Sequence, residues 1–170
     1  MAVAATGLTS GNSITDATSY ATASITPSAN VLVLAAFRTF RAAGNPGDIA
    51  TASGNGLTWV KVATVSLAGA RQTIFRAMGA SPSAGAVTFA TGVETNDAGS
   101  WSIIEFSGVD TGGTNGSAAV VQSATGTGTS TTPLATLAAF GSANNATYGS
   151  IGSYNATDHT TPGTGFTEVH

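Results

Sequence analysis

Cysteine is absent from this sequence of 170 residues. Its absence excludes disulfide bonds, thiol catalysis and metal sites built from thiolates. Charged residues are scarce as well, at 8% of the chain, against about 25% in ordinary soluble domains. Gly, Ala, Ser and Thr take up the difference. We therefore expect a neutral, hydroxyl-rich surface, which suits packing against neighbouring molecules better than attraction of charged ligands.

Basic residues number five, against eight acidic ones, and the formal net charge is −3. Their close pairs in the sequence are Arg38 with Arg41 and Arg71 with Arg76. Binding to DNA or RNA requires several phosphate contacts from a basic patch. The sequence therefore predicts that nucleic acid is not a partner.

Long hydrophobic runs are missing too. No apolar stretch approaches the ~18 residues that a membrane-spanning helix needs, so we expect no membrane association. The N-terminal stretch MAVAATGLTSGNS has neither the basic region nor the continuous apolar region of a signal peptide. A composition typical of extracellular proteins without an export signal fits a virion protein, which is assembled in the host cytoplasm and released by lysis. Loss of a signal is the alternative that these observations leave open.

The sequence does contain a succession of short apolar or alternating runs, separated by Gly, Asn, Pro, Ser and Thr. Such runs at intervals of ~10–15 residues are typical of a β-sandwich or a jelly roll. We predict strands over residues 29–38, 54–66, 71–78, 85–91 and 100–107, and weaker ones over 117–124, 133–140 and 146–153.

The predicted fold is therefore all-β. We expect one domain over residues 1–170, a single β-sandwich of jelly-roll type with about eight or more short strands. Residues 1–28, which precede the first predicted strand, are interpreted as an N-terminal arm. The Thr/Gly/Ser-rich residues 123–133 are predicted to form an exposed loop, or an edge strand in an extended conformation.

Groups suited to catalysis are few. A hydrolytic triad needs a base, and the histidines are His159, in a polar loop, and His170. Glycoside hydrolysis needs two facing carboxylates, and no feature of the sequence places Glu94 beside Glu105. The loops GTGTS and TGGTNG lack the lysine and the helix start of a phosphate-binding loop. We expect no enzyme activity and no cofactor.

Two kinds of ligand site have candidate residues. Asp97 and Asp110 lie in the turn sequences TNDAGS and VDTGGTNGS, whose oxygens are of the type that binds Ca²⁺. Ordinary turn chemistry is the alternative for both. Tyr148 and Tyr154, in a polar segment, are candidates for stacking on a sugar ring. Packing in the core or at its rim is the alternative for these tyrosines.

One carboxylate lies inside an apolar strand. In SWSIIEFSGVD, alternation places Glu105 on the same face as Trp101 and Ile103, and a buried carboxylate needs a partner. Arg76, Lys61 or the amides of the turn after the strand could supply it. A sharper alternative is a Lys–Asn isopeptide bond at Lys61 with Glu105 as its catalyst. Trp59 and Trp101 are predicted core residues.

The order of these motifs resembles a family of Gly/Thr-rich β-sandwich domains found in phage virion proteins and bacterial surface proteins. The segments that carry the resemblance span most of residues 30–170: NVLVLAAF, GNGLTWVKVATV, RQTIFRAMGASPSAGAVTFATG, WSIIEFSGVD and GTGFTEV. The resemblance implies a structural, display or adhesive role and brings no catalytic residues. It also implies a structural Glu105, and one or two further strands that a neighbouring chain could supply.

From the resemblance and the composition together, we expect a non-enzymatic structural protein of a phage virion. It would be a capsid decoration protein or a tail- or fibre-associated one, located in the virion and extracellular after lysis. Its partners would be other virion proteins and copies of itself, as a homo-oligomer. The alternative is a carbohydrate-binding or adhesive surface domain whose partner is a cell-surface glycan.

Overall fold

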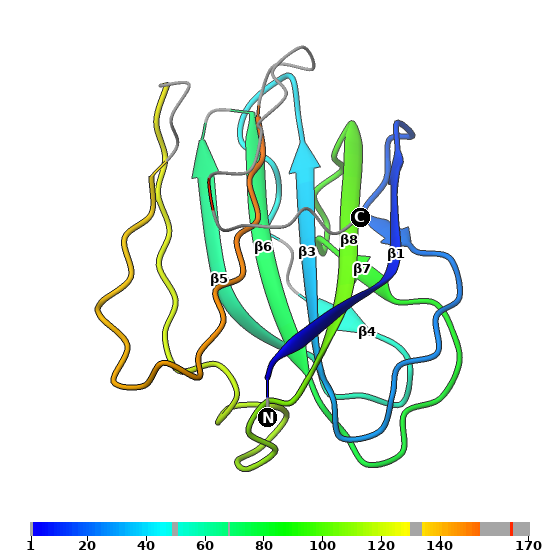
Figure 1. Ribbon diagram of the computed structural model, residues 1–170. Coiled ribbons are helices and arrows are strands. Elements are labelled where there is room, and N and C mark those ends of the chain that lie inside the picture. Colours follow the sequence, from blue (N-terminus) through cyan, green and yellow to red (C-terminus); the bar gives the residue numbers. More distant parts are fainter. Residues whose placement is uncertain (1, 49–50, 68, 130–133, 154–163, 165–170) are drawn as a thin grey trace.

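The computed structural model describes residues 2–48, 51–67, 69–129, 134–153 and Thr164. Eight β-strands and no helix are formed by these residues (Figure 1). Accordingly, the described part of the chain holds no helix able to cross a membrane. In chain order the strands are β1 (Ala4–Ser13), β2 (Ser19–Ala21), β3 (Leu32–Phe40), β4 (Thr51–Ser53), β5 (Val60–Leu67), β6 (Ala70–Ala77), β7 (Thr88–Ala90) and β8 (Ala98–Ser107).

The strands form two antiparallel sheets. The larger sheet has five strands in the order β1-β8-β3-β6-β5, and the smaller has three in the order β2-β7-β4. An apolar cluster contributed by both sheets fills the space between them. The predicted all-β sandwich is therefore confirmed.

The topology resembles a jelly roll only in part. An eight-stranded jelly roll nests its strand pairs, first with eighth, second with seventh, third with sixth and fourth with fifth. The pairs β1–β8, β2–β7 and β3–β6 follow this order. However, β5 pairs with β6 in the larger sheet, and within the described residues β4 and β5 are not hydrogen-bonded neighbours. The jelly-roll type therefore stays a prediction.

Strand β3 is buried on both faces. Its first six residues, Leu32–Phe37, are all buried, as expected for a continuous apolar run in the middle of a sheet. On one face Val33, Ala35 and Phe37 meet side chains of the smaller sheet, among them Phe89, in the inner core. The length of the apolar run thus fixes β3 as the central strand.

The opposite face of the larger sheet carries a second apolar cluster. Its buried members are Leu32, Leu34, Met78, Ile104 and Phe106, and Val3, Val109, Ala119, Val120 and Tyr148 pack against them. Much of this cover comes from the segment after β8, which contains no strand in its described residues. The weaker strands predicted over 117–124 and 146–153, and over the described part of 133–140, are therefore wrong. Ala119, Val120 and Tyr148 of these segments cover a sheet face at a few apolar points, without a hydrogen-bonded ladder.

The prediction of an N-terminal arm over residues 1–28 is also wrong. Residues 4–13 form β1, which pairs along its length with β8, and residues 19–21 form β2. Most β1 side chains are exposed, so the sequence carries no alternating pattern that would mark a strand. The pairing with β8 makes it one. Of the predicted loop, residues 123–129 are exposed and without regular structure, while 130–133 lie outside the described residues.

Candidate functional site

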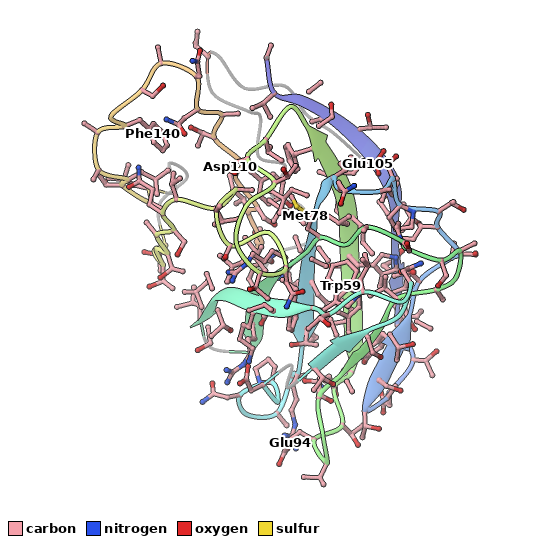
Figure 2. The ribbon with its side chains drawn as sticks, turned by 90° about the horizontal axis from the view of Figure 1, so that it is seen from below. Trp59, Met78, Glu94, Glu105, Asp110 and Phe140 are labelled. Atoms are coloured by element: carbon pink, nitrogen blue, oxygen red, sulfur yellow. The ribbon has the colours of Figure 1, made fainter. Side chains whose placement is uncertain are left out.

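Glu105 lies near the end of β8, opposite Val33 of β3, on the face that points toward the inner core. Its carboxylate accepts two hydrogen bonds from Ser28, from the backbone N–H at 2.9 Å and from the hydroxyl at 3.0 Å. Figure 2 shows Glu105 on the side of the molecule where β1 lies. The carboxylate thus ties the segment before β3 to the end of β8.

The three predicted partners of Glu105 are wrong. Arg76 pairs with Leu34 rather than with Val33, so alternation directs its side chain to the opposite face of the sheet. Lys61 lies on β5, which β6 and β3 separate from β8; three strand spacings amount to ~14 Å. The hydrogen bonds expected from the turn amides after β8 come instead from Ser28. The partner, Ser28, lies outside every predicted strand, so the alternation of side chains along strands could not identify it.

The isopeptide alternative is contradicted by the same arrangement. The ammonium of Lys61 lies 2.9 Å from a carboxylate oxygen of Asp48, in an ion pair that Arg71 joins at 3.5 Å. A catalyst for bond formation at Lys61 would have to contact it, and Glu105 is held by Ser28 instead. Lys61 on β5 and Arg71 on β6 therefore form a charged cluster around Asp48, which lies in the loop before β4. Exposed pairs of this kind contribute less than about 1 kcal/mol.

We expect Glu105→Gln to lower the free energy of unfolding by about 1–2 kcal/mol. The amide removes the charge and replaces one accepting oxygen by a donor, so the two hydrogen bonds from Ser28 cannot both persist. Urea unfolding followed by tryptophan fluorescence measures the change. Ser28→Ala is the matched variant, and the double variant should lose less than the two single losses combined. A change within about 0.5 kcal/mol, typical of an uninvolved surface site, would refute the structural role.

Glu94 and Glu105 are not brought together. Glu94 precedes β8 and Glu105 lies near its end, and Figure 2 shows the two residues well apart. A glycosidase needs its two carboxyl groups about 5–9.5 Å apart. Glu94 instead forms an ion pair with Arg41 at 2.6 Å. This pair of glutamates therefore cannot act on one glycosidic bond.

The two tryptophans pack against the inner core, as predicted. Trp101 lies parallel to Phe37, with the ring centroids 6.2 Å apart and an interplanar angle of 4°. The indole N–H of Trp59 donates to the Gly54 carbonyl at 3.3 Å. Both rings are therefore structural rather than platforms for a ligand.

Asp110 holds its own turn, whereas Asp97 links the start of β8 to the segment after β3. Asp97 accepts a hydrogen bond from the Ala42 N–H at 2.6 Å, and Asp110 accepts one from the Gly112 N–H at 2.8 Å. The ten residues of β8 lie between the two carboxylates, a distance of ~33 Å along an extended strand. The part of the chain that the structure describes contains no group of three or more potential His, Cys, Asp or Glu metal ligands. Asp110 thus has the turn chemistry that was the alternative to Ca²⁺ binding, and Asp97 instead has a long-range structural contact.

Tyr148 is part of the second apolar cluster rather than an exposed sugar platform. Its ring packs edge-on against Phe106, with centroids 5.7 Å apart and an interplanar angle of 74°. Burial raises the pKa of the Tyr148 phenol, and a hydrogen bond with Ser150 opposes that effect. Tyr154, together with His159 and His170, lies outside the described residues. The core-packing alternative therefore describes Tyr148.

The raised pKa of Tyr148 predicts a loss of stability in alkali. Because the folded-state pKa lies above the ~10 of an unfolded tyrosine, the stabilising contribution is present below pH ~10 and is lost as the pH rises through the folded-state pKa. Tyr148→Phe keeps the ring packing, so its unfolding free energy should fall less steeply above pH ~10 than that of the unaltered protein. Urea unfolding at several alkaline pH values measures the slope. Burial also raises the pKa of Tyr20, so the stability of both proteins should still fall to some extent above pH ~10. Equal slopes for the variant and the unaltered protein would contradict the burial of the Tyr148 phenol.

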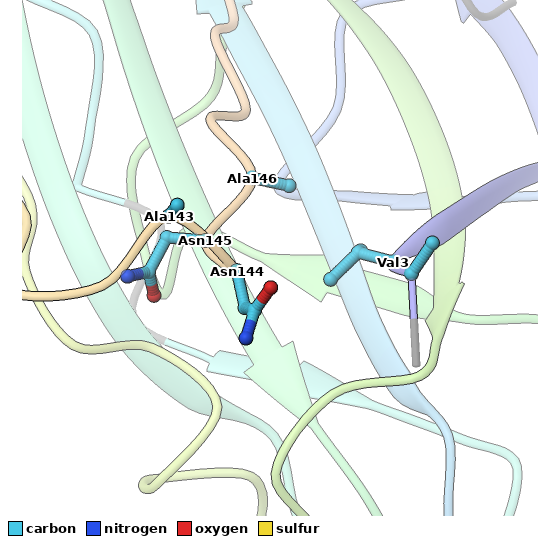
Figure 3. Close-up of a pocket in the computed structure, with 6 residues that line it drawn as sticks. Val3, Ala143, Asn144, Asn145 and Ala146 are labelled. Carbon is cyan, nitrogen blue, oxygen red and sulfur yellow. The ribbon is translucent and has the colours of Figure 1, made fainter.

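A pocket of about 370 Å³ lies beside the start of β1 (Figure 3). Its walls are small or amide side chains: Ala2, Val3, Ala143, Asn144, Asn145 and Ala146. None of these side chains titrates, so the pocket offers hydrogen bonds but no acid, base or nucleophile. Its volume is at the lower end of the range for small-molecule sites.

A projecting segment is the feature that sequence reasoning found only in part, as the exposed loop predicted over residues 123–133. We define the arm as residues 121–129 and 134–147. Val120 precedes it and Tyr148 follows it, and both pack on the second cluster. Figure 1 shows the arm beside the β5 edge of the larger sheet, and Figure 2 shows Phe140 of the arm standing away from the sandwich. The arm has no charged residue, and neither do residues 111–157 as a whole. That uncharged stretch is the feature of the sequence from which the arm could have been predicted.

The arm folds back on itself as a hairpin. The side-chain amide of Gln122 donates to the Ala138 carbonyl and accepts from the Ala138 N–H, both at 3.0 Å. Gly126 lies against the carbonyl of Leu134. Both contacts fit the same antiparallel alignment of the two limbs, in which Gln122 faces Ala138 and Gly126 faces Leu134. Between the described parts of the two limbs no backbone-to-backbone hydrogen bond is formed.

The fold and these surfaces define a β-sandwich with a projecting uncharged arm. Comparison with family models, with curated proteins and with solved structures gave no match.

Proposed function

We propose that this protein is a non-enzymatic structural component of a phage virion, a capsid decoration protein or a tail- or fibre-associated one. It acts by contact with other virion proteins and with copies of itself. The observation that carries the proposal is the exposed, uncharged arm. An extended hairpin whose described limbs share no backbone-to-backbone hydrogen bond gains most when a neighbouring surface covers it.

The surface of the arm supports this proposal. Val121 and Leu134 are exposed to 65% and 79%, and Ile151 beyond the arm is exposed to 58%. Exposed apolar groups in a segment without charge favour close packing in a repeated assembly over steering of a soluble ligand. The motif order that resembles phage β-sandwich domains adds to this support, and we propose that the fold is a jelly-roll variant whose fifth strand has joined the larger sheet.

Particle association tests the function. Particles purified by density gradient from the host in which the chain is naturally produced should contain it at a fixed copy number. Quantitative mass spectrometry against a major particle protein measures that ratio across fractions. Absence from the particle fractions, or a ratio that varies between fractions, would overturn the proposal.

The rival function is a carbohydrate-binding or adhesive domain. The pocket beside β1 favours it, because the carboxamides of Asn144 and Asn145 can hydrogen-bond to sugar hydroxyls. Retention on a glycan column, lost in Asn144→Ala and kept in Tyr148→Phe, would support this rival. Absence of retention on a broad panel of glycans would remove it.

A further inference from the structure

Among the residues that the structure describes, strand β1 has one open edge. It pairs with β8 on one side and ends the larger sheet on the other. An open edge presents unpaired N–H and C=O groups, and natural proteins protect such edges with Lys, Pro or bulges. Residues 1–15 contain no charged residue and no proline, and the only such device in β1 is the irregularity between Gly7 and Thr9. This edge is therefore available for pairing with another strand.

The first limb of the arm, residues 121–129, has the complementary properties. It is extended (Figure 1), rich in Thr, and free of charge and proline, so its backbone can enter a ladder. Residues 123–129 are all exposed. Within the described residues the limb's backbone groups have no backbone partners. Its nine residues match the ten of β1 in length.

The first limb of the arm and the open edge of β1 lie at opposite edges of the larger sheet. Figure 1 shows this limb beyond β5 and β1 at the other edge. In this arrangement a molecule does not pair its own first limb with its own β1, whereas two copies arranged head to tail can. Such a contact satisfies both unpaired surfaces at once, which a two-fold pairing of β1 with β1 would not do.

We propose that residues 121–129 of one copy add as a strand to the β1 edge of the next. The contact is heterologous, so it repeats, and it builds a ring if the rotation closes and a filament if it does not. The absence of charge on both strands means that no like-charge pair opposes the contact. The contact itself is inferred from the fold, whereas its role within a particle rests on the proposed function.

Lysine substitutions on each surface test the contact. The edge variant is Ala4→Lys with Ser10→Lys, and the arm variant is Val121→Lys with Thr125→Lys. All four side chains are exposed, so folding should persist, and circular dichroism checks this. The control variant, Val93→Lys with Thr95→Lys, makes the same change at exposed positions of a turn. Light scattering after size-exclusion chromatography gives each mass.

The unaltered protein and the control variant should form assemblies that grow with concentration, whereas each lysine variant alone should remain at the chain mass of 16.6 kDa. An equal mixture of the edge and arm variants should give a species of twice that mass, because one intact arm meets one intact edge. A monomeric mixture, a monomeric unaltered protein, or an arm variant that still dimerises would each overturn the proposal.

Incorporation into particles separates the two proposals. Assembly in solution without association with particles would remove the virion function and leave the contact. Association of the edge and arm variants with particles at the normal copy number would remove the contact and leave the function.

Discussion

Replacing Phe37 by alanine is expected to lower the free energy of unfolding by about 3–5 kcal/mol, the cost of deleting a buried aromatic ring from a core. Phe37 is fully buried, and its ring centroid lies 4.3 Å from that of Phe89 and 5.7 Å from that of Tyr20. Small domains have about 5–15 kcal/mol of total stability, so this one change consumes a large share of it. Urea unfolding at neutral pH measures the loss.

The site of Phe37 leaves little scope for repacking. A Cβ atom on Gly99 would lie 2.9 Å from the tip of the Phe37 ring, so on that side the neighbour is a glycine with no side chain to move into a cavity. Val93→Ala is the control, since Val93 is 93% exposed and should change stability by less than about 0.5 kcal/mol. A loss at Phe37 as small as the control's would contradict the position of this ring at the centre of the inner core.

Asn96→Ala should cost about 2–3 kcal/mol, because it leaves a buried N–H without a partner. The fully buried Asn96 side chain accepts a hydrogen bond from the Gly47 N–H at 3.1 Å and donates to the Glu94 carbonyl at 3.2 Å. Its backbone carbonyl accepts from the Tyr20 hydroxyl at 2.8 Å and from the Ala17 N–H at 3.0 Å. The residue therefore joins three loops at one end of the sandwich.

Asn145→Ala supplies the comparison for Asn96. Its side chain also donates one hydrogen bond, to the Ser142 carbonyl at 2.9 Å, but Asn145 is exposed. Water can replace that bond, so the change should stay within about 0.5 kcal/mol. Urea unfolding of both variants under one set of conditions gives the difference. Equal losses would show that the loops are not held through the Asn96 side chain.

The contact between Glu105 and Ser28 and the projecting arm differ in how far each could be predicted from the sequence. That Glu105 needs a partner followed from its place in an apolar strand, yet the partner, Ser28, lies in a segment without periodicity. The arm could have been suspected from its long uncharged stretch, but its projection depends on Val120 and Tyr148, which anchor its ends. Partners of this kind are far apart in the chain, and only the fold brings them together.

The strongest strands were determined by the sequence alone. Continuous apolar character marks β3, and alternation with turn residues at the ends marks β6 and β8, because a strand buried on one or both faces must repeat its apolar side chains accordingly. The all-β class and the low charge of the surface follow from the same residues.

Tertiary structure decided what local pattern could not. Strand β1 has mostly exposed, small side chains, and it is a strand because β8 offers a ladder of hydrogen bonds. Residues 117–124, with a stronger β pattern, meet no such edge and instead cover a sheet face with Ala119 and Val120. Strand formation depends on a hydrogen-bonding neighbour as well as on side-chain preference, and that neighbour is set by the fold as a whole.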